Sequence, residues 1–419
     1  MAEEKALNAA QMKFVNRRKV LRLIRRGAVA RSELAKEIGL TRASISVIVA
    51  DLINQGVLVE TGLRRSAGGR KPVLLELRPD FACALGLTIS RVGAEAGLID
   101  LGGRLLFRCP VIISRTNRAR AVLDIKHALR SVLGSGALEG RLLGLGLSTP
   151  GPVDAVTGTI LAPPNFDLWH GMALCEKLID TVGCPAFLEN NAQALTMAEK
   201  AYGAGREFSS FVLLVVESGI GAGIVRGDER HVGWRSAGNE VGHTSINFDG
   251  PRCSCGLRGC VELYASVPAV LRLAQKELPR LTSWQEFVDL AHEGDPVCRR
   301  LMDDQARALS TVLVNVLNVF ELDAVVLTGD ILYRGDMLRA AIGRYVNQTA
   351  INRQLHHVPV RLSTLGEHAE LMAAAGIAIE RFVQGELEPA VSDISHQGSP
   401  LPGRPSRPDS VRAVDGSGR

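Results

Sequence analysis

The sequence predicts an α/β protein in which a small helical module with a two-stranded ribbon precedes a larger region of alternating strands and helices. Residues 13–78 show helical apolar spacing three times and then two short strands. From about Phe81, apolar strand candidates alternate with helical stretches, as is typical of layered α/β folds. Residues 385–419 lose this periodicity and fill with Pro, Ser and Gly. We therefore expect domains at 1–79 and 80–384, followed by a disordered tail at 385–419.

Length and composition agree with this division. At 419 residues the chain is too long to fold around a single hydrophobic core, which suggests two or three domains. It contains no run of eighteen uncharged apolar residues, and its first residues lack the order of a signal peptide. We expect a soluble cytoplasmic protein with no membrane partner.

The charge is unevenly distributed along the chain. Residues 1–78 contain sixteen Lys or Arg and seven Asp or Glu, a formal charge of +9, whereas the whole chain carries +5 and the remainder therefore −4. A basic module attached to a larger acidic one is typical of proteins that meet a polyanion through the smaller part. A solvated basic face would give the same count.

The first module reads as three helices and a hairpin. The first helix is expected over 14–26, ending at Gly27; the second follows a cap at Ser32; the third opens at Thr41 and ends at Gly56. The strands "VLVET" and "KPVLLELR" bracket the basic turn "GLRRSAGGR". This is the order of a winged helix-turn-helix.

Two sets of side chains in this module are placed to contact DNA. The start of the third helix would enter the major groove, and the hairpin tip would lie along the backbone or in a minor groove. The groove-facing residues are Thr41, Arg42, Ala43, Ser44 and Ser46. The wing residues are Arg64, Arg65, Arg70 and Lys71. Operator DNA is the expected partner, although winged helices also serve as protein-docking modules.

The larger region is expected to contain two similar halves, because strand clusters open both near Phe81 and near Ser209. Strands are expected at 82–89, 93–101, 142–148, 186–190, 209–216, 324–329 and 358–364. Helices are expected near 119–134, 191–202, 267–278, 295–319, 336–348 and 367–384.

Three of the eight cysteines crowd into "CSCGLRGC", just after a histidine. The ligand set His243, Cys253, Cys255 and Cys260 has the spacing H-x9-C-x-C-x4-C, and Gly256 and Gly259 allow the tight turns between its members. Three thiolates and an imidazole complete a closed tetrahedral zinc shell, which indicates structural Zn²⁺ in a loop at 243–260. Iron–sulfur ligation and unligated buried cysteines are the alternatives.

The stretch "GNEVGHTSINFDGPRCSCGLRGCVELYAS", from Gly238 to Ser266, resembles the signature of the ROK family of repressors and sugar kinases. The family pattern E-x-G-H followed by C-x-C-G-x-x-G-C-x-E is matched from Glu240 to Glu262. The resemblance implies an actin-like ATPase (ribonuclease H-like) fold of two lobes with a sugar cleft between them. The winged helix in front is the arrangement of the family's xylose and N-acetylglucosamine repressor branch, whose members are dimers or tetramers.

The positions that a family kinase needs are altered here. The first phosphate loop, D-x-G-G-T in kinases, reads Thr88 in place of the Asp and Ser90-Arg91 in place of the glycines. The catalytic Asp of N-D-A-N is replaced by Asn191, and an amide cannot accept a proton. A second glycine-rich turn at Gly219 and the turn near Gly329 still resemble nucleotide-side motifs, so residual nucleotide binding is left open.

The sugar cleft of the family is better retained. The resemblance implies six hydrogen-bonding partners for sugar hydroxyls: Asn165, Asn190, Asn191, Glu240, His243 and Glu262. Each could instead be a satisfied loop-capping residue.

Together these features predict a sugar-responsive DNA-binding regulator, a repressor of carbohydrate-utilisation genes that is no longer a kinase and that forms a homodimer or homotetramer. An active ROK sugar kinase with a DNA-binding domain and a regulator controlled by a protein partner are the alternatives. The sugar and the operator are not identified by the sequence.

Overall fold

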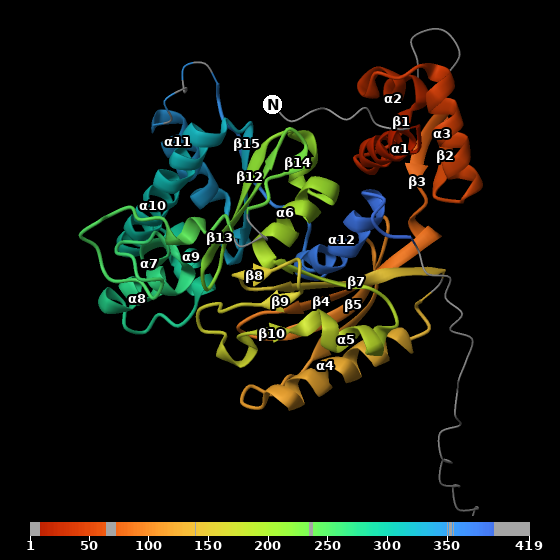
Figure 1. Cartoon of the computed structure of the whole chain (residues 1–419). Helices are drawn as coiled ribbons and strands as arrows, with labels where there is room; N and C mark the ends of the chain where they lie inside the picture. Colours follow the sequence, from red (N-terminus) through yellow and green to blue (C-terminus); the bar gives the residue numbers. More distant parts are fainter. Residues whose placement is uncertain are drawn as a thin grey trace, which may run out of the picture.

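The computed structural model has three parts that share one body: an N-terminal module and two α/β lobes (Figure 1). Among the described residues no helix combines the length and apolar character needed to cross a bilayer. Of the expected tail only 385–388 is described, and the rest lies outside the described residues. The structure describes residues 9–63, 73–138, 140–233, 238–349, 351, 354 and 356–388.

The N-terminal module contains three helices and a small sheet. The helices are α1 (Ala9–Arg25), α2 (Arg31–Ile38) and α3 (Arg42–Asn54). The sheet has the order β1-β3-β2, so the expected ribbon gains a third strand. Its strands are β1 (Val29–Ala30), β2 (Leu58–Leu63) and β3 (Val73–Leu77).

Two details of the module differ from the expectation and one agrees with it. Helix α1 begins at Ala9, five residues earlier than expected. The cap assigned to Ser32 is wrong: Ala30 holds the N-cap position, and the Glu33 carboxylate accepts from the Ala30 N–H at 3.0 Å. The cap of α3 is confirmed, because the Thr41 hydroxyl accepts from the Ser44 N–H at 3.1 Å.

Lobe one is built on a five-stranded sheet of order β11-β7-β4-β5-β6. Strand β4 pairs with β5 in antiparallel and with β7 in parallel register. Helices α4 (Arg118–Leu133) and α5 (Leu174–Val182) share an apolar core with one face of this sheet. The strands are β4 (Ala82–Ile89), β5 (Ala94–Asp100), β6 (Leu105–Val111), β7 (Arg141–Thr149) and β11 (Ala186–Asn190).

Lobe two repeats this topology with the order β14-β13-β12-β15-β16. Its central strand β12 pairs antiparallel with β13 and parallel with β15, as β4 does in lobe one, which confirms the expected pair of similar halves. The strands are β12 (Phe211–Val216), β13 (Ile220–Arg226), β14 (Glu229–Arg230), β15 (Ala324–Gly329) and β16 (Val360–Leu362).

Helices cover both faces of the second sheet, which explains its continuous apolar strands. One face packs on α8 (Val267–Glu277), α9 (Trp284–Glu293), α10 (Pro296–Phe320) and α11 (Asp336–Thr349). The other face packs on α6 (Asn191–Tyr202) and α12 (Ala369–Val383), which lie between the two sheets (Figure 1). The remaining short elements are β8 (Val153–Asp154), β9 (Thr159–Ile160), β10 (Met172–Ala173) and α7 (Glu262–Ala265).

Helix α12 also packs directly on lobe one, and a glycine makes this possible. A Cβ atom added at Gly146 of β7 would lie 1.8 Å from the carbonyl oxygen of Ala374. The same face of lobe one, together with α12, packs against α1 in one apolar cluster that includes Leu21, Ile24 and Phe382. The N-terminal module therefore rests on the lobes through a buried seam.

Candidate functional site

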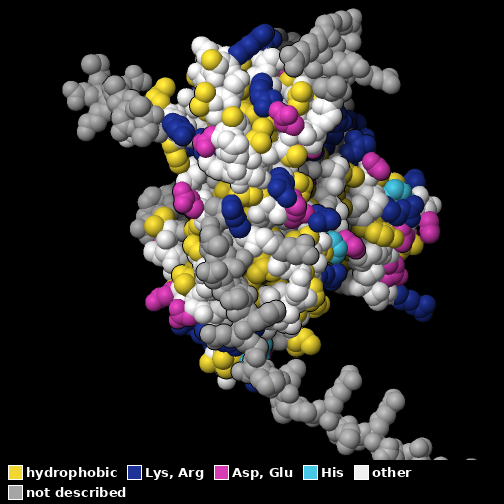
Figure 2. Space-filling view, turned by 90° about the vertical axis from the view of Figure 1, so that its right-hand side faces the viewer, with side chains coloured by type: hydrophobic (Ala, Val, Ile, Leu, Met, Phe, Trp, Pro, Cys, Tyr) yellow, Lys and Arg dark blue, Asp and Glu magenta, His cyan; other side chains and the backbone are white. Residues whose placement is uncertain are grey.

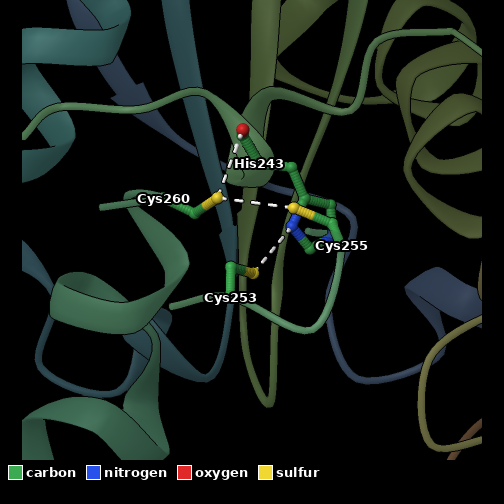
Figure 3. Close-up of side chains that lie close together, drawn as sticks. All are labelled: His243, Cys253, Cys255 and Cys260. Carbon is green, nitrogen blue, oxygen red and sulfur yellow. Dashed lines mark hydrogen bonds between the residues drawn. The ribbon is translucent and has the colours of Figure 1, made fainter. Parts of the chain in front are cut away.

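A histidine and three cysteines gather at one point of lobe two (Figure 3). The Cys253 Sγ lies 3.5 Å from the His243 Nδ1, and the Cys255 Sγ lies 3.6 Å from the Cys260 Sγ. All four potential ligand atoms lie within 4.8 Å of one another. In a tetrahedral site with metal–sulfur bonds of about 2.3 Å the sulfurs lie about 3.8 Å apart, so the four residues have the right size for such a site.

The loop reaches this shape through its glycines. Gly256 has φ 98° and Gly259 has φ 66°, the left-handed region that glycine enters without strain. A Cβ atom at Gly259 would also lie 1.7 Å from the Asn247 carbonyl oxygen. Both glycines are therefore required to turn the chain so that the thiols converge.

The thiols of the cluster differ in their ionisation. Burial, with hydrogen bonds from the neighbouring thiols, raises the pKa of Cys260 to about 12. Hydrogen bonding from the Leu257 backbone lowers the pKa of the exposed Cys255 thiol. A buried thiol of this kind becomes a thiolate at neutral pH when a cation coordinates it, so the donor set fits a metal ion.

A narrow polar cavity lies between the lobes beside this cluster. Five of the six residues expected to bind sugar line it: Asn190, Asn191, Glu240, His243 and Glu262. The sixth, Asn165, does not line the cavity; its side chain is exposed, although the preceding Pro164 does line it. Asn165 has φ 56°, a conformation that few non-glycine residues adopt.

His243 belongs to both places. Its Nδ1 faces the Cys253 thiol, while the ring also lines the cavity. Glu262 follows Cys260 by two residues at the start of α7. The metal cluster and the cavity therefore share one wall.

The cavity residues also perform the local structural work that was the alternative to sugar binding. The Asn190 Oδ1 accepts from the Ala192 N–H at 2.8 Å and caps α6. The Glu262 Oε2 accepts from the Ile220 N–H at 2.9 Å. In each case one polar atom has a structural partner, and the side chain still lines the cavity.

The approach of lobe one to these residues depends on Gly151. A Cβ atom at Gly151 would lie 2.1 Å from the Asn190 Nδ2 and 3.2 Å from the Glu240 Oε1. The first distance is closer than any real side-chain contact, so the Asn190 amide would have to move, and the second is tight enough that the Glu240 carboxylate would have to shift slightly. Gly151 thus sets the shape of the cavity floor.

Two charged residues in the cavity were not expected to bind sugar. Arg91 lines the cavity opposite Glu217. Burial, reinforced by Glu370 and Asp330, raises the pKa of Glu217 to about 8, although the Arg91 charge acts in the opposite direction. Burial likewise raises the pKa of Glu240. The sequence signal that could have identified Glu217 as a cavity residue is its position just before the glycine-rich turn at Gly219.

The turn between β4 and β5 is held by hydrogen bonds between its own residues. The Ser90 hydroxyl accepts from the backbone N–H groups of Val92 and Gly93 at 3.3 and 3.2 Å. Thr88 donates its hydroxyl to the Glu370 carboxylate of α12 at 3.2 Å. Two of the backbone donors of this turn, the N–H groups of Val92 and Gly93, are therefore taken up by its own serine instead of facing a phosphate.

On the N-terminal module, the start of α3 points to solvent. All five residues expected to face a DNA groove are exposed: Thr41, Arg42, Ala43, Ser44 and Ser46. Arg64, Arg65, Arg70 and Lys71 of the expected wing lie outside the described residues. Figure 2 shows Lys and Arg side chains spread over the face it presents, with hydrophobic and acidic side chains between them.

Two lobes of repeated topology with a polar cavity between them define the class of two-lobed, actin-like ATPase folds. The chain belongs to the ROK family, whose model matches residues 89–381. It is 28% identical over 389 residues to a putative xylose repressor of Caldicellulosiruptor sp., covering 89% of this chain and 97% of that relative. It is 30% identical over 252 residues to the glucokinase of Thermotoga maritima, covering 57% of this chain and 80% of that enzyme.

A solved structure shows the same fold over nearly the whole length. The crystal structure of a ROK family transcriptional regulator, a homologue of the E. coli MLC protein, superposes with a TM-score of 0.75 at 23% identity. The match covers 89% of this chain and 97% of that one. The regulators thus match the N-terminal module as well as the lobes, whereas the glucokinase matches a shorter part of the chain.

Proposed function

We propose that this protein is a sugar-responsive transcriptional regulator that represses carbohydrate-utilisation genes and no longer phosphorylates its sugar. The observation that carries the proposal is the cavity itself. It is lined by amide and carboxylate side chains, with Asn191 at the expected position of the base, in a chain whose N-terminal module contains three helices and a small sheet. The relatives named as repressors support the regulatory part.

The side chains that line the cavity are suited to a neutral sugar. Asn191, Glu240 and Glu262 offer amide and carboxylate oxygens that accept from hydroxyls, and amides also donate. Glu240 and Glu262 disfavour a further anionic group in this partly buried space, and Arg91, the one Arg or Lys among the described lining residues, already donates to the Pro164 carbonyl. We therefore propose an unphosphorylated monosaccharide as effector, with Asn165 reaching it from the rim.

Three features of the cleft support the proposed loss of phosphoryl transfer. Asn191 cannot take the proton of the attacking hydroxyl, a function worth on the order of 10² to 10⁴ in rate. The β4–β5 turn has Ser90 and Arg91 where the phosphate loop of the family has glycines, and the Ser90 hydroxyl takes up the N–H groups of Val92 and Gly93. In addition, the Arg91 guanidinium donates twice to the Pro164 carbonyl, at 3.0 and 3.1 Å, and so fills this side of the cleft.

We propose that His243, Cys253, Cys255 and Cys260 hold a structural Zn²⁺. Four protein ligands leave no coordination position open, so the ion would stabilise the loop rather than take part in chemistry. The loop in turn fixes the imidazole of His243 and the carboxylate of Glu262 in the cavity wall.

The proposed DNA contacts come from α3 and from the wing. Thr41, Arg42, Ala43, Ser44 and Ser46 would meet phosphates and base edges, and Arg64, Arg65, Arg70 and Lys71 the backbone. A palindromic operator requires two such helices about 34 Å apart, which is why we propose a homodimer or homotetramer.

The test of this function is an operator titration. DNA selected by the protein from a random pool is labelled, and its affinity is measured by fluorescence anisotropy with and without pentoses and hexoses. We expect one sugar to change the affinity by 5- to 150-fold, the range of ordinary allosteric coupling. A protein that binds DNA with the same affinity in every sugar would contradict the proposal.

One observation favours the kinase alternative. Glu217, with its pKa raised to about 8, shares the cavity with Gly219 and Gly221 of the second glycine turn. A carboxyl that titrates near neutral pH can act as a general base. Glu217 is thus a candidate for proton abstraction, beside the carboxyl groups of Glu240 and Glu262 in the same cavity.

If the proposed function is right, an aspartate in place of Asn191 should not make the protein a sugar kinase. We expect Asn191→Asp to leave ATP-dependent sugar phosphorylation at the background level, because the β4–β5 turn still offers no phosphate cradle. Coupled-enzyme detection of ADP measures this, and Asn191→Asp with Glu217→Gln is the matched control. Enzyme-like turnover in Asn191→Asp that disappears in the double variant would support the alternative.

A further inference from the structure

The proposed sugar site and the DNA-binding module are joined by two elements that begin in the cavity. Helix α6 begins at Asn191 in the cavity wall and ends at Tyr202. Strand β13 begins at Ile220 in the same wall and ends at Arg226. Twelve helical residues span about 18 Å and seven strand residues about 23 Å. Both elements thus lead away from the cavity over a similar distance, to Tyr202 in one case and to Arg226 in the other.

The far ends of these elements contact α1 of the N-terminal module. The Arg25 Nη2 donates to the Tyr202 hydroxyl at 3.2 Å, and its guanidinium lies 5.0 Å from the Tyr202 ring centroid. In the hairpin after β13, Asp228 pairs with Arg26 at 2.8 Å and Glu229 with Arg22 at 3.0 Å. The basic residues at the end of α1 therefore contact both the end of α6 and the hairpin that follows β13.

Arg25 makes a third contact, with the helix between the sheets. Its Nη1 lies 2.5 Å from the Glu380 carboxylate of α12, and its side chain is only 6% exposed. The Arg206 guanidinium, just beyond α6, also donates to the backbone carbonyl of Arg26 at 3.1 Å. The buried, charge-assisted contact of Arg25 with Glu380 fixes the orientation of the two side chains more strictly than an exposed ion pair would.

The three arginines at the end of α1 contact different parts of the lobes, so their contacts depend on how the two lobes are arranged. Arg22 and Arg25 lie in the last turn of α1, and Arg26 follows directly after the helix. Arg22 and Arg26 are held by the hairpin of lobe two, whereas Arg25 is held by α6 and α12 between the lobes. If the hairpin moves relative to α12, α1 must turn with it or lose one set of contacts.

We propose, on the basis of the proposed function, that Arg22, Arg25 and Arg26 are positioning residues for operator binding, which transmit the state of the cavity to α3 through α6 and β13. Contacts that differ between the lobe arrangements would change the operator affinity, and ordinary allosteric coupling changes affinity by 5- to 150-fold.

The experiment reverses the charges of one pair in the full-length protein. The quantity measured is the ratio of operator affinities without and with the effector sugar. We expect Arg22→Glu and Glu229→Arg each to bring this ratio several-fold closer to one, and the double variant to restore it. A merely structural or long-range charge effect on DNA would change both affinities equally and leave the ratio unchanged.

A pair inside the N-terminal module serves as the control. Arg31 and Glu60 lie 2.7 Å apart and do not cross the junction, so Arg31→Glu and Glu60→Arg should leave the ratio unchanged. Single variants at Arg22 and Glu229 that retain the wild-type ratio would overturn the proposal, as would a double variant that fails to restore it.

A second measurement separates this proposal from the proposed function. Without any sugar, Arg25→Met should speed amide hydrogen exchange in α1 while α3 keeps its protection. If the operator affinity of the wild type responds to no sugar, the proposed function fails. The hydrogen-exchange rates of Arg25→Met then still show whether Arg25 positions α1. Unchanged exchange in α1, or equal loss of protection in α1 and α3, would overturn its role as a positioning residue.

Discussion

Replacing Cys260 by serine is expected to remove the bound metal and most of the operator affinity together. The thiol is fully buried and lies 3.4 Å from the His243 carbonyl oxygen, and Val261 and Glu262 follow it into the core and the cavity wall. Losing a ligand should weaken metal binding more than the 10- to 100-fold typical of a lost outer-shell partner. Metal per chain, measured after dialysis by elemental analysis, should fall from one toward zero. Operator affinity should fall at least about 10-fold.

Cys109→Ser is the matched control for this variant. Cys109 is a partly exposed thiol of lobe one, outside the cluster. We expect this substitution to leave both the metal content and the operator affinity unchanged. An unchanged metal content in Cys260→Ser would refute the ligand assignment. Loss of metal with full operator affinity would refute the link between the loop and DNA binding.

Replacing Gly151 by alanine is expected to weaken the response to sugar strongly and to leave the metal content of the protein unchanged. The new methyl group would have to displace the Asn190 amide and the Glu240 carboxylate, which lie 2.1 and 3.2 Å from its position. Displacing two hydrogen-bonding partners at about 1 kcal/mol or more each should weaken sugar binding about 10- to 100-fold. Moving Asn190 also costs the cap of α6, typically about 1 kcal/mol of stability. Calorimetry and thermal unfolding measure the two effects.

Gly93→Ala provides the comparison. A Cβ atom at Gly93 would meet nothing within 4 Å, although the residue lies in the turn beside the cavity. This variant should bind sugar like the wild type. Equal affinity in Gly151→Ala would mean that Asn190 and Glu240 do not contact the sugar, and the cavity would then need another occupant.

The features that could be predicted from the sequence are those with local signals. The continuous apolar strands, the cap at Thr41 and the spacing of the metal cluster are all encoded within short stretches, and the structure agrees with them. Five of the six sugar-binding candidates line one cavity because they belong to motifs matched residue by residue. Their roles in binding stay a prediction.

The features that were missed depend on contacts between distant segments or on weak local patterns. The contact of Arg91 with Pro164 joins residues 73 positions apart, and the ion pair of Arg25 with Glu380 joins residues 355 apart. No spacing rule reports such pairs. Strand β6 was missed because it contains Pro110 and lies at a sheet edge, where apolar alternation is weak. Helix α9 was missed although Ser283 caps it.

The central claim is that the cavity binds a sugar without phosphorylating it. The most direct test is a calorimetric sugar titration of the purified protein in the presence of Mg²⁺ and ATP, with ADP measured in the same cell. We predict a saturable heat of binding for one monosaccharide and no ADP above the background rate. Steady production of ADP and sugar phosphate at the rate of an ordinary enzyme would contradict the account, and so would the absence of binding by every sugar tested.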